Sequence, residues 1–165
     1  MSKGIACCFT GHRDLGSDFS KQNLRMAIES LIERGVKIFI AGGALGFDTE
    51  AALEVLRQRK AGKDVQLHVY VPCLEQDKYW KFQQKWMYKK ILHHADYVDM
   101  PQNYYNNQCM KIRNYKMVEN SSYVITYYNG KYYSGTGQTY RYATKLGHEI
   151  INLCQNFKEE KPSWR

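Results

Sequence analysis

The sequence predicts an α/β fold in which a mostly parallel sheet is covered by helices on both faces. Short apolar runs, typical of buried strands, alternate along the chain with stretches of helical periodicity. Successive strand–helix–strand units build parallel sheets, and their right-handed crossovers place helices on both faces. The length of 165 residues, with 44% hydrophobic and 24% charged residues, suits one globular domain.

The first third of the chain already shows this alternation. The first strand is expected at Ile5 to Phe9, a continuous apolar run that ends in a polar, glycine-containing turn. Apolar residues from Leu24 to Leu31 recur at helical spacing, and Gly35 can end that helix in a left-handed conformation. A second strand follows at Val36 to Ala41. The next helix carries Ala52, Val55 and Leu56 on one side.

The rest of the chain continues the pattern. The expected strands are Val65 to Val71, Tyr97 to Met100, Tyr123 to Tyr128 and Ile150 to Cys154. The expected helices run from about Tyr79 to His93, from Cys109 to Asn120 and from about Thr139 to Leu146. Phe82, Trp86 and Met87 are expected to face the core. Residues 1–155 are interpreted as one domain and residues 156–165 as a C-terminal tail.

Composition narrows the class of protein. The five cysteines are odd in number and lack CxxC spacing, so the sequence supports neither a disulfide framework nor a metal site. The apolar run at the N-terminus is shorter than a secretory or membrane segment, which predicts a soluble cytoplasmic protein. The net charge of +8 implies attraction to anions: nucleotide phosphates, nucleic acid or acidic protein surfaces.

Candidate ligand-binding residues follow three of the expected strands. In parallel sheets, ligands bind beyond the carboxyl ends of the strands, where adjacent crossovers diverge. The loops there are expected to meet at one rim. Their candidate residues are Thr10, Gly11, His12 and Arg13; Gly42, Gly43 and Asp48; and Ser134, Gly135, Thr136, Gly137, Gln138 and Thr139.

The two glycine-rich loops differ in charge. Asp48 and Glu50 occupy the first turn of the second helix, where carboxylates already satisfy the helix dipole and would repel a phosphate. The loop at Gly135 to Gly137 carries no acid, offers neighbouring hydroxyl groups and leads into a helix. The charge pattern therefore assigns a phosphate to the later loop. Asp48 suits ligand hydroxyls or base N–H groups, because an ionised carboxylate only accepts hydrogen bonds.

Several of these features have an alternative interpretation. Asp48 could cap its helix, and the two roles are compatible. His12 and Arg13 could hold an anion at the end of the first strand or form a solvated turn. The many tyrosines near the rim could stack on bases or pack in the core. The lysine- and aromatic-rich segment at residues 79–90 could face nucleic acid or be an ordinary helix with one solvated side.

Four linked motifs resemble a known family. FTGHR at residues 9–13, GGALGFDTEAA at 42–52, RNYKMVENSSYVI at 113–125 and SGTGQTYRYA at 134–143 are similar to motifs of the YpsA-like family of the SLOG superfamily. That superfamily includes the Lonely Guy phosphoribohydrolases and DNA-processing protein A. The resemblance implies a three-layer Rossmann-like fold, a homodimer, and a pocket for a nucleotide or nucleotide-derived ligand with Arg113 added to the loop residues.

One departure from the hydrolase pattern bears on catalysis. When Gly135 to Gly137 is aligned with the Lonely Guy glycine motif, Arg141 occupies the position of its catalytic glutamate. The carboxylate that stabilises a developing oxocarbenium ion is then absent. Asp48 or Glu50 could replace it only within hydrogen-bond reach of the sugar. No other catalytic motif occurs, so catalytic residues stay unassigned and no cofactor is implied.

The resulting expectation is a protein that senses, carries or sequesters a nucleotide or nucleotide-derived signal. Two alternatives remain open. One is a phosphoribohydrolase or other N-glycosidase acting on nucleoside monophosphates. The other is a single-stranded DNA-binding protein, which the positive net charge favours. The expected partners are therefore a small nucleotide-type molecule, a second copy of the chain and, less strongly, nucleic acid, with no membrane partner.

Overall fold

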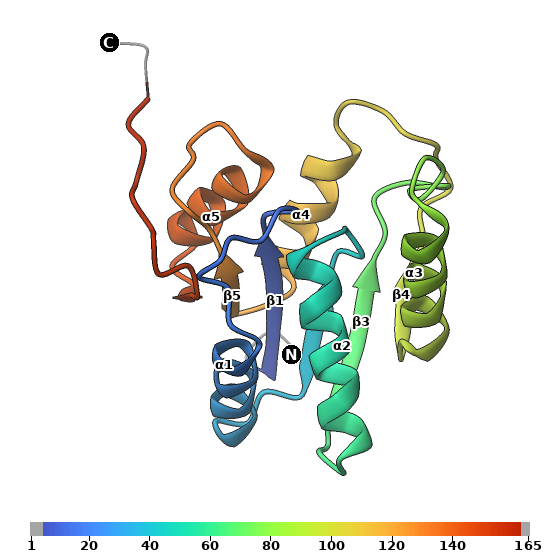
Figure 1. Ribbon diagram of the computed structural model, residues 1–165, viewed down its shortest axis with the longest axis horizontal. Coiled ribbons are helices and arrows are strands. Elements are labelled where there is room, and N and C mark those ends of the chain that lie inside the picture. The colour runs from blue at the N-terminus through green and yellow to red at the C-terminus, as the bar shows by residue number, and fades with distance from the viewer. Residues whose placement is uncertain (1–4, 163–165) are drawn as a thin grey trace.

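The computed structural model describes residues 5–162, which form one mostly buried parallel sheet with helices on both faces (Figure 1). The six strands are β1 (Ala6–Gly11), β2 (Ile38–Ala41), β3 (Gln66–Tyr70), β4 (Tyr97–Asp99), β5 (Tyr123–Tyr127) and β6 (Glu149–Asn152). The five helices are α1 (Lys21–Glu33), α2 (Phe47–Lys60), α3 (Phe82–His94), α4 (Cys109–Glu119) and α5 (Gly135–Lys145). The predicted α/β class and Rossmann-like arrangement are confirmed.

All strand pairs are parallel, in the order β4-β3-β2-β1-β5-β6. The chain leaves β1 toward β2 on one side, whereas β5 pairs with β1 on the other. The loops after β1 and β5 therefore diverge at their carboxyl ends, which is where open α/β sheets form ligand crevices.

The core has two parts, one on each face of the sheet. Along β1, Cys7 and Phe9 point into the cluster that α1, α2 and α3 cover, whereas Ala6 and Cys8 point into the cluster beneath α4 and α5. This alternation follows from the two-residue period of a strand. Because both faces of β1 are buried, its sequence is a continuous apolar run and not an alternation of apolar and polar residues.

Helix α3 departs from the sequence-based expectation. Phe82 and Trp86, predicted to face the core, are 82% and 56% exposed, while Tyr88 and Ile91 are the buried residues of this helix. Apolar residues lie on both sides of α3, and the sheet contacts the side that carries Ile91. The aromatic pair is left in solvent.

Helix α5 begins earlier than predicted, at Gly135 instead of Thr139. The extension has a local cause: the Ser134 hydroxyl accepts a hydrogen bond from the Gly137 N–H at 2.9 Å and so caps the helix. The glycine cluster therefore forms the first helical turn and not a loop before it.

The segment after β6 runs back along the loop that follows β5. The Lys158 N–H donates to the Asn129 carbonyl at 3.0 Å, and the Glu160 N–H donates to the Gly130 carbonyl at 2.9 Å. Phe157 packs against Tyr128. Among residues 5–162, no helix combines the length and apolar character that a bilayer crossing requires.

Candidate ligand-binding site

The three predicted loops meet at the carboxyl ends of β1, β2 and β5. They enclose a pocket of about 270 Å³, which we call the rim pocket. Its lining residues are Thr10, Gly11, His12, Arg13, Ala44, Asp48, Met110, Arg113, Asn114, Ser134, Gly135 and Thr136. Nine of the fourteen sequence-predicted residues are among them.

The other five predicted residues lie beside the rim pocket and support its walls. Gly42, Gly43, Gly137, Gln138 and Thr139 do not line it. A Cβ on Gly43 would meet Tyr88 at 3.1 Å, on the side away from β1. Thr139 is 2% exposed, and its hydroxyl donates to the Gly135 carbonyl within α5 at 2.8 Å.

Three pocket residues were missed by the sequence reasoning: Ala44, Met110 and Asn114. Met110 and Asn114 lie on α4 within one turn of Arg113. The three-residue spacing from Arg113 was a signal for Met110, whereas the position of Asn114, directly after Arg113, gave no such signal.

Arg113 is nearly buried, and backbone groups hold its guanidinium in place. Its Nη1 donates to the carbonyls of Gly42, at the end of β2, and of Tyr70, at 3.2 Å. Its Nε donates to the Asn114 side chain at 2.8 Å. Burial lowers the pKa of Arg113 from its ordinary value, and the nearby Asp48 carboxylate opposes that shift.

Asp48 faces Arg113 across Gly42. A Cβ on Gly42 would lie 2.6 Å from Arg113 Nη1 and 2.8 Å from Asp48 Oδ2, so a larger residue there would displace one or both of these side chains. Burial raises the pKa of Asp48 to about 6, and the positive charge of Arg113 offsets only part of that effect. Asp48 is therefore mostly ionised at pH 7, and a modest fall in pH below 7 is enough to protonate it.

Asp48 does not cap α2, contrary to one interpretation of the sequence. Gly46 is the N-cap residue and has no side chain to offer. Asp48 lies in the first turn, and its Oδ2 accepts an N–H from Ala44 at 3.4 Å. It therefore braces the loop that precedes its own helix.

The β1 loop is fixed against its neighbours on both sides. The Phe47 N–H donates to the His12 carbonyl at 3.2 Å, and the Asn129 N–H donates to His12 Nε2 at 3.1 Å. Because Nε2 accepts this bond, the ring is neutral with its proton on Nδ1. Burial lowers the pKa of His12, in agreement with that state.

The N-terminus of α5 provides the acid-free wall of the rim pocket. The Ser134 hydroxyl accepts the Gly137 N–H. The N–H groups of Gly135 and Thr136 lie in the first turn of α5, where backbone N–H groups have no acceptor within the helix. The first turn of α5 carries no acidic residue, whereas that of α2 carries Asp48 and Glu50. The expected difference in charge between the two turns is present.

Arg141 does not line the rim pocket. Its Nη1 donates to the Tyr132 carbonyl at 3.0 Å, and its guanidinium lies 3.7 Å from the centre of the Tyr132 ring. The residue at the hydrolase-glutamate position therefore contributes neither acid nor base to this site.

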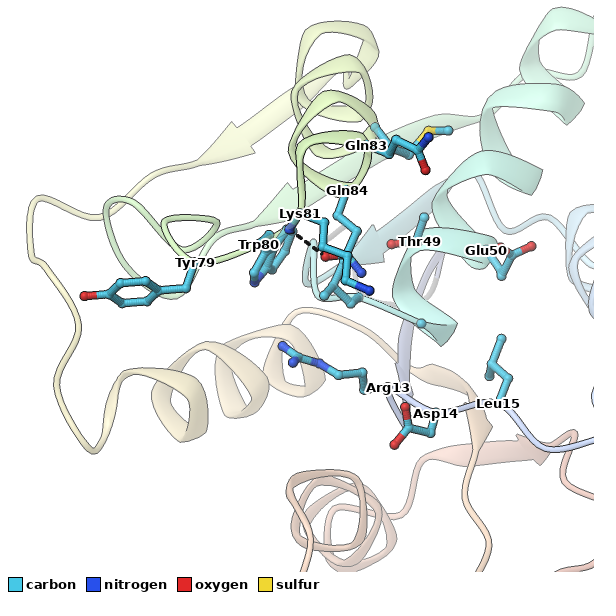
Figure 2. Close-up of a pocket in the computed structure, with 13 residues that line it drawn as sticks. Arg13, Asp14, Leu15, Thr49, Glu50, Tyr79, Trp80, Lys81, Gln83 and Gln84 are labelled. Carbon is cyan, nitrogen blue, oxygen red and sulfur yellow. Dashed lines mark hydrogen bonds between the residues drawn. The ribbon is translucent and has the colours of Figure 1, made fainter.

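A larger neighbouring cavity of about 570 Å³, here the side pocket, lies between the β1 loop, the start of α2 and the start of α3. Figure 2 shows its residues, with Arg13 and Asp14 on one side and Trp80, Lys81 and Gln84 on the other. Arg13 lines both pockets. The Arg13 side chain is exposed, and within the described residues 5–162 it forms no hydrogen bond or ion pair.

Comparison with known proteins identifies relatives over most of the chain. The family model YpsA, described as the YspA SLOG family, matches residues 6–152. The prophage-derived protein YoqJ of Bacillus subtilis is 33% identical over 156 residues, covering 85% of this chain and 90% of that protein. A UPF0398 protein of Halalkalibacterium halodurans is 30% identical over 120 residues, which is 72% of this chain and 64% of the relative.

Solved structures of similar fold include two DNA-processing proteins A. The Helicobacter pylori protein, described with a single-stranded DNA binding mode, superposes with a TM-score of 0.70 at 20% identity. The match covers 96% of this chain and 69% of that one. The Streptococcus pneumoniae protein gives a TM-score of 0.67 at 18% identity, covering 90% and 50% of the two chains. At these identities the likeness concerns the fold.

Proposed function

This chain belongs to the YspA SLOG family, and we propose that its rim pocket binds a nucleotide or nucleotide-derived ligand. One observation carries the proposal: the acid-free N-terminus of α5 and the buried Asp48–Arg113 pair line the same pocket. Such a pocket offers N–H donors to an oxyanion and a carboxylate acceptor to a hydroxyl.

Each part of the ligand has a suitable counterpart. A phosphate would accept hydrogen bonds from the Gly135 and Thr136 N–H groups, with the exposed Arg13 supplying the positive charge. A sugar diol would donate to Asp48. At about 270 Å³ the pocket is slightly smaller than the range of common small-molecule sites, which suits a phosphorylated sugar better than a whole dinucleotide.

Thermal shift with a panel of nucleoside mono-, di- and triphosphates tests the proposal. A ligand at about 100 times its dissociation constant should raise the free energy of unfolding by about 2.7 kcal/mol. Arg13→Gln and Asp48→Asn should each remove the shift. Arg57→Gln is the matched control, because Arg57 is exposed and lies on α2 outside both pockets. No shift with any member of the panel would contradict the proposal.

The same incubations test the hydrolase alternative. Asp48 is the single acid lining the rim pocket, and Arg141 points elsewhere. Release of free base from a nucleoside monophosphate, lost in Asp48→Asn, would establish an N-glycosidase. Intact substrate after long incubation would restrict the protein to binding.

Single-stranded DNA binding is a second candidate function. The net charge of +8 and the fold shared with the Helicobacter pylori protein favour it. Fluorescence anisotropy with a labelled oligonucleotide should show an affinity that falls steeply with salt, by a log–log slope of about −0.7 for each phosphate contacted. Salt-independent binding would argue against it. On the family resemblance we also propose a cytoplasmic homodimer, which light scattering after size exclusion tests for the oligomer.

A further inference from the structure

Helix α3 and the segment before it expose three aromatic rings. Tyr79, Phe82 and Trp86 are 89%, 82% and 56% exposed. Phe82 and Trp86 are four residues apart, so they share one side of the helix, opposite Ile91 in the core. Figure 2 shows the ring of Tyr79 pointing away from the other residues that line the side pocket. Large exposed rings gathered at one place indicate an interaction site.

The lysines near these rings form no ion pairs, although Glu75 and Asp77 line a pocket with Lys78, Lys85 and Lys89. Residues 78–94 contain five lysines and no acidic residue. The lysines are Lys78, Lys81, Lys85, Lys89 and Lys90, and none of them forms an ion pair with a residue that the structure describes. Lys78 lies 5.4 Å from the centre of the Tyr79 ring, and Lys90 lies 5.2 Å from that of Trp86. The positive charge here is available to a partner.

We propose that this α3 surface, the three rings and five lysines, binds single-stranded nucleic acid. This inference rests on the proposed single-stranded DNA binding and assigns that binding to the α3 surface. Single-strand sites combine aromatic rings, on which bases stack, with a basic track along the phosphates. Protein–protein interfaces, in contrast, are depleted in lysine. A membrane-bound helix needs a broad apolar face, whereas Lys85 and Lys89 flank the rings of α3.

The α3 surface continues toward the rim pocket. Tyr79, Trp80 and Lys81 line the side pocket, and Arg13 lines both the side pocket and the rim pocket. A single nucleic-acid strand whose bases stack on Phe82 and Trp86 therefore has a path past Trp80 to Arg13. There the exposed guanidinium of Arg13 can bind one of its phosphates. Figure 2 shows Arg13 extended below Trp80 and Lys81.

The test is fluorescence anisotropy of a labelled oligothymidylate with variants of the α3 surface. Phe82→Ala and Trp86→Ala should each weaken binding about fivefold or more, because each removes one stacking platform. Trp86→Phe keeps a ring and should retain most of the affinity. The double variant K85Q/K89Q should reduce the log–log salt slope by about 1.4, as expected for two lost phosphate contacts.

Matched controls separate this surface from general charge and exposure. Met26 is 56% exposed on α1, and Lys145 is exposed at the far end of α5. Met26→Ala and Lys145→Gln should leave the affinity unchanged. Because all of these positions are at the surface, the melting temperatures of the variants should stay close to that of the wild type, which confirms that each variant is folded.

The outcomes distinguish the proposals. If the wild-type protein binds no oligonucleotide at any salt, the second candidate function and the α3 proposal both fail, while the nucleotide pocket stands on its own assay. If the wild type binds but Phe82→Ala and Trp86→Ala bind equally well, the α3 proposal alone is overturned. Retention on anionic vesicles, lost in the same variants and without oligonucleotide binding, would overturn it in favour of a membrane surface.

Discussion

Replacing Asp48 with Asn should change the free energy of unfolding by an amount that shifts in favour of the variant as pH rises. Burial raises the pKa of Asp48 to about 6, against an ordinary value of 3.8 in an unfolded chain. The native state therefore binds the proton more tightly, and folding stability falls as pH rises between these two values. The difference corresponds to about 3 kcal/mol at 1.36 kcal/mol per pKa unit, of which about 2 kcal/mol is lost between about pH 4.5 and about pH 7.5.

Urea unfolding of the wild type and Asp48→Asn at several pH values measures this contribution. The substitution also changes the hydrogen bond from Ala44 and the surroundings of Arg113, but with Arg113 charged throughout these contributions are much the same at every pH. The informative quantity is therefore the change with pH in the stability difference between the two proteins. It should grow by about 2 kcal/mol in favour of the variant from about pH 4.5 to about pH 7.5. A difference that stays constant, or that shrinks as pH rises, would refute the proposed burial of an ionised Asp48.

Three further substitutions and one reactivity measurement probe the frame of the protein. Gly46→Ala should cost about 3 kcal/mol or more, because Gly46 has φ +83° and its Cβ would lie 2.0 Å from the Arg13 carbonyl oxygen. Gly35→Ala, with φ +96° but no atom within 4 Å, should cost only about 1–2 kcal/mol in the same urea titration. Ser134→Ala removes the cap of α5 and should lower the free energy of unfolding by about 1 kcal/mol in thermal or urea melts. The Cys7 thiol, fully buried and with its pKa raised by burial, should react with a thiol reagent only after unfolding.

The fold was predictable because most strands and helices leave a pattern in their own local sequence. Buried parallel strands appear as apolar runs. A glycine after a helix indicates that the helix ends there in the left-handed conformation, and Gly35 after α1 has φ +96°. The orientation of α3 was not predictable in this way. Its apolar residues lie on two sides, and the position of the sheet relative to the helix decides which side is buried. That position depends on contacts distant in sequence.

The candidate site was partly predictable for a topological reason. Loops after β1, β2 and β5 meet because parallel strands end at one edge, so a list of strand-following residues recovers most of the rim pocket. Met110 and Asn114 were missed because α4 reaches the rim only through the long crossover from β4 at one edge to β5. The second role of Arg13, as a wall of the side pocket, likewise depends on where α3 packs.

The energetic cost of the Asp48–Arg113 pair bears on the proposed binding function. Burying two charged groups beside Gly42 lowers stability at neutral pH, and apolar residues of similar volume would pack there without that cost. Strongly perturbed groups at a pocket wall are characteristic of functional sites. Glycine at position 42 lets the two side chains keep these positions, which constrains the loop further. A ligand hydroxyl donating to Asp48 would offset part of the desolvation of the carboxylate, so binding should lower the pKa of Asp48 and tighten as pH rises through about 6.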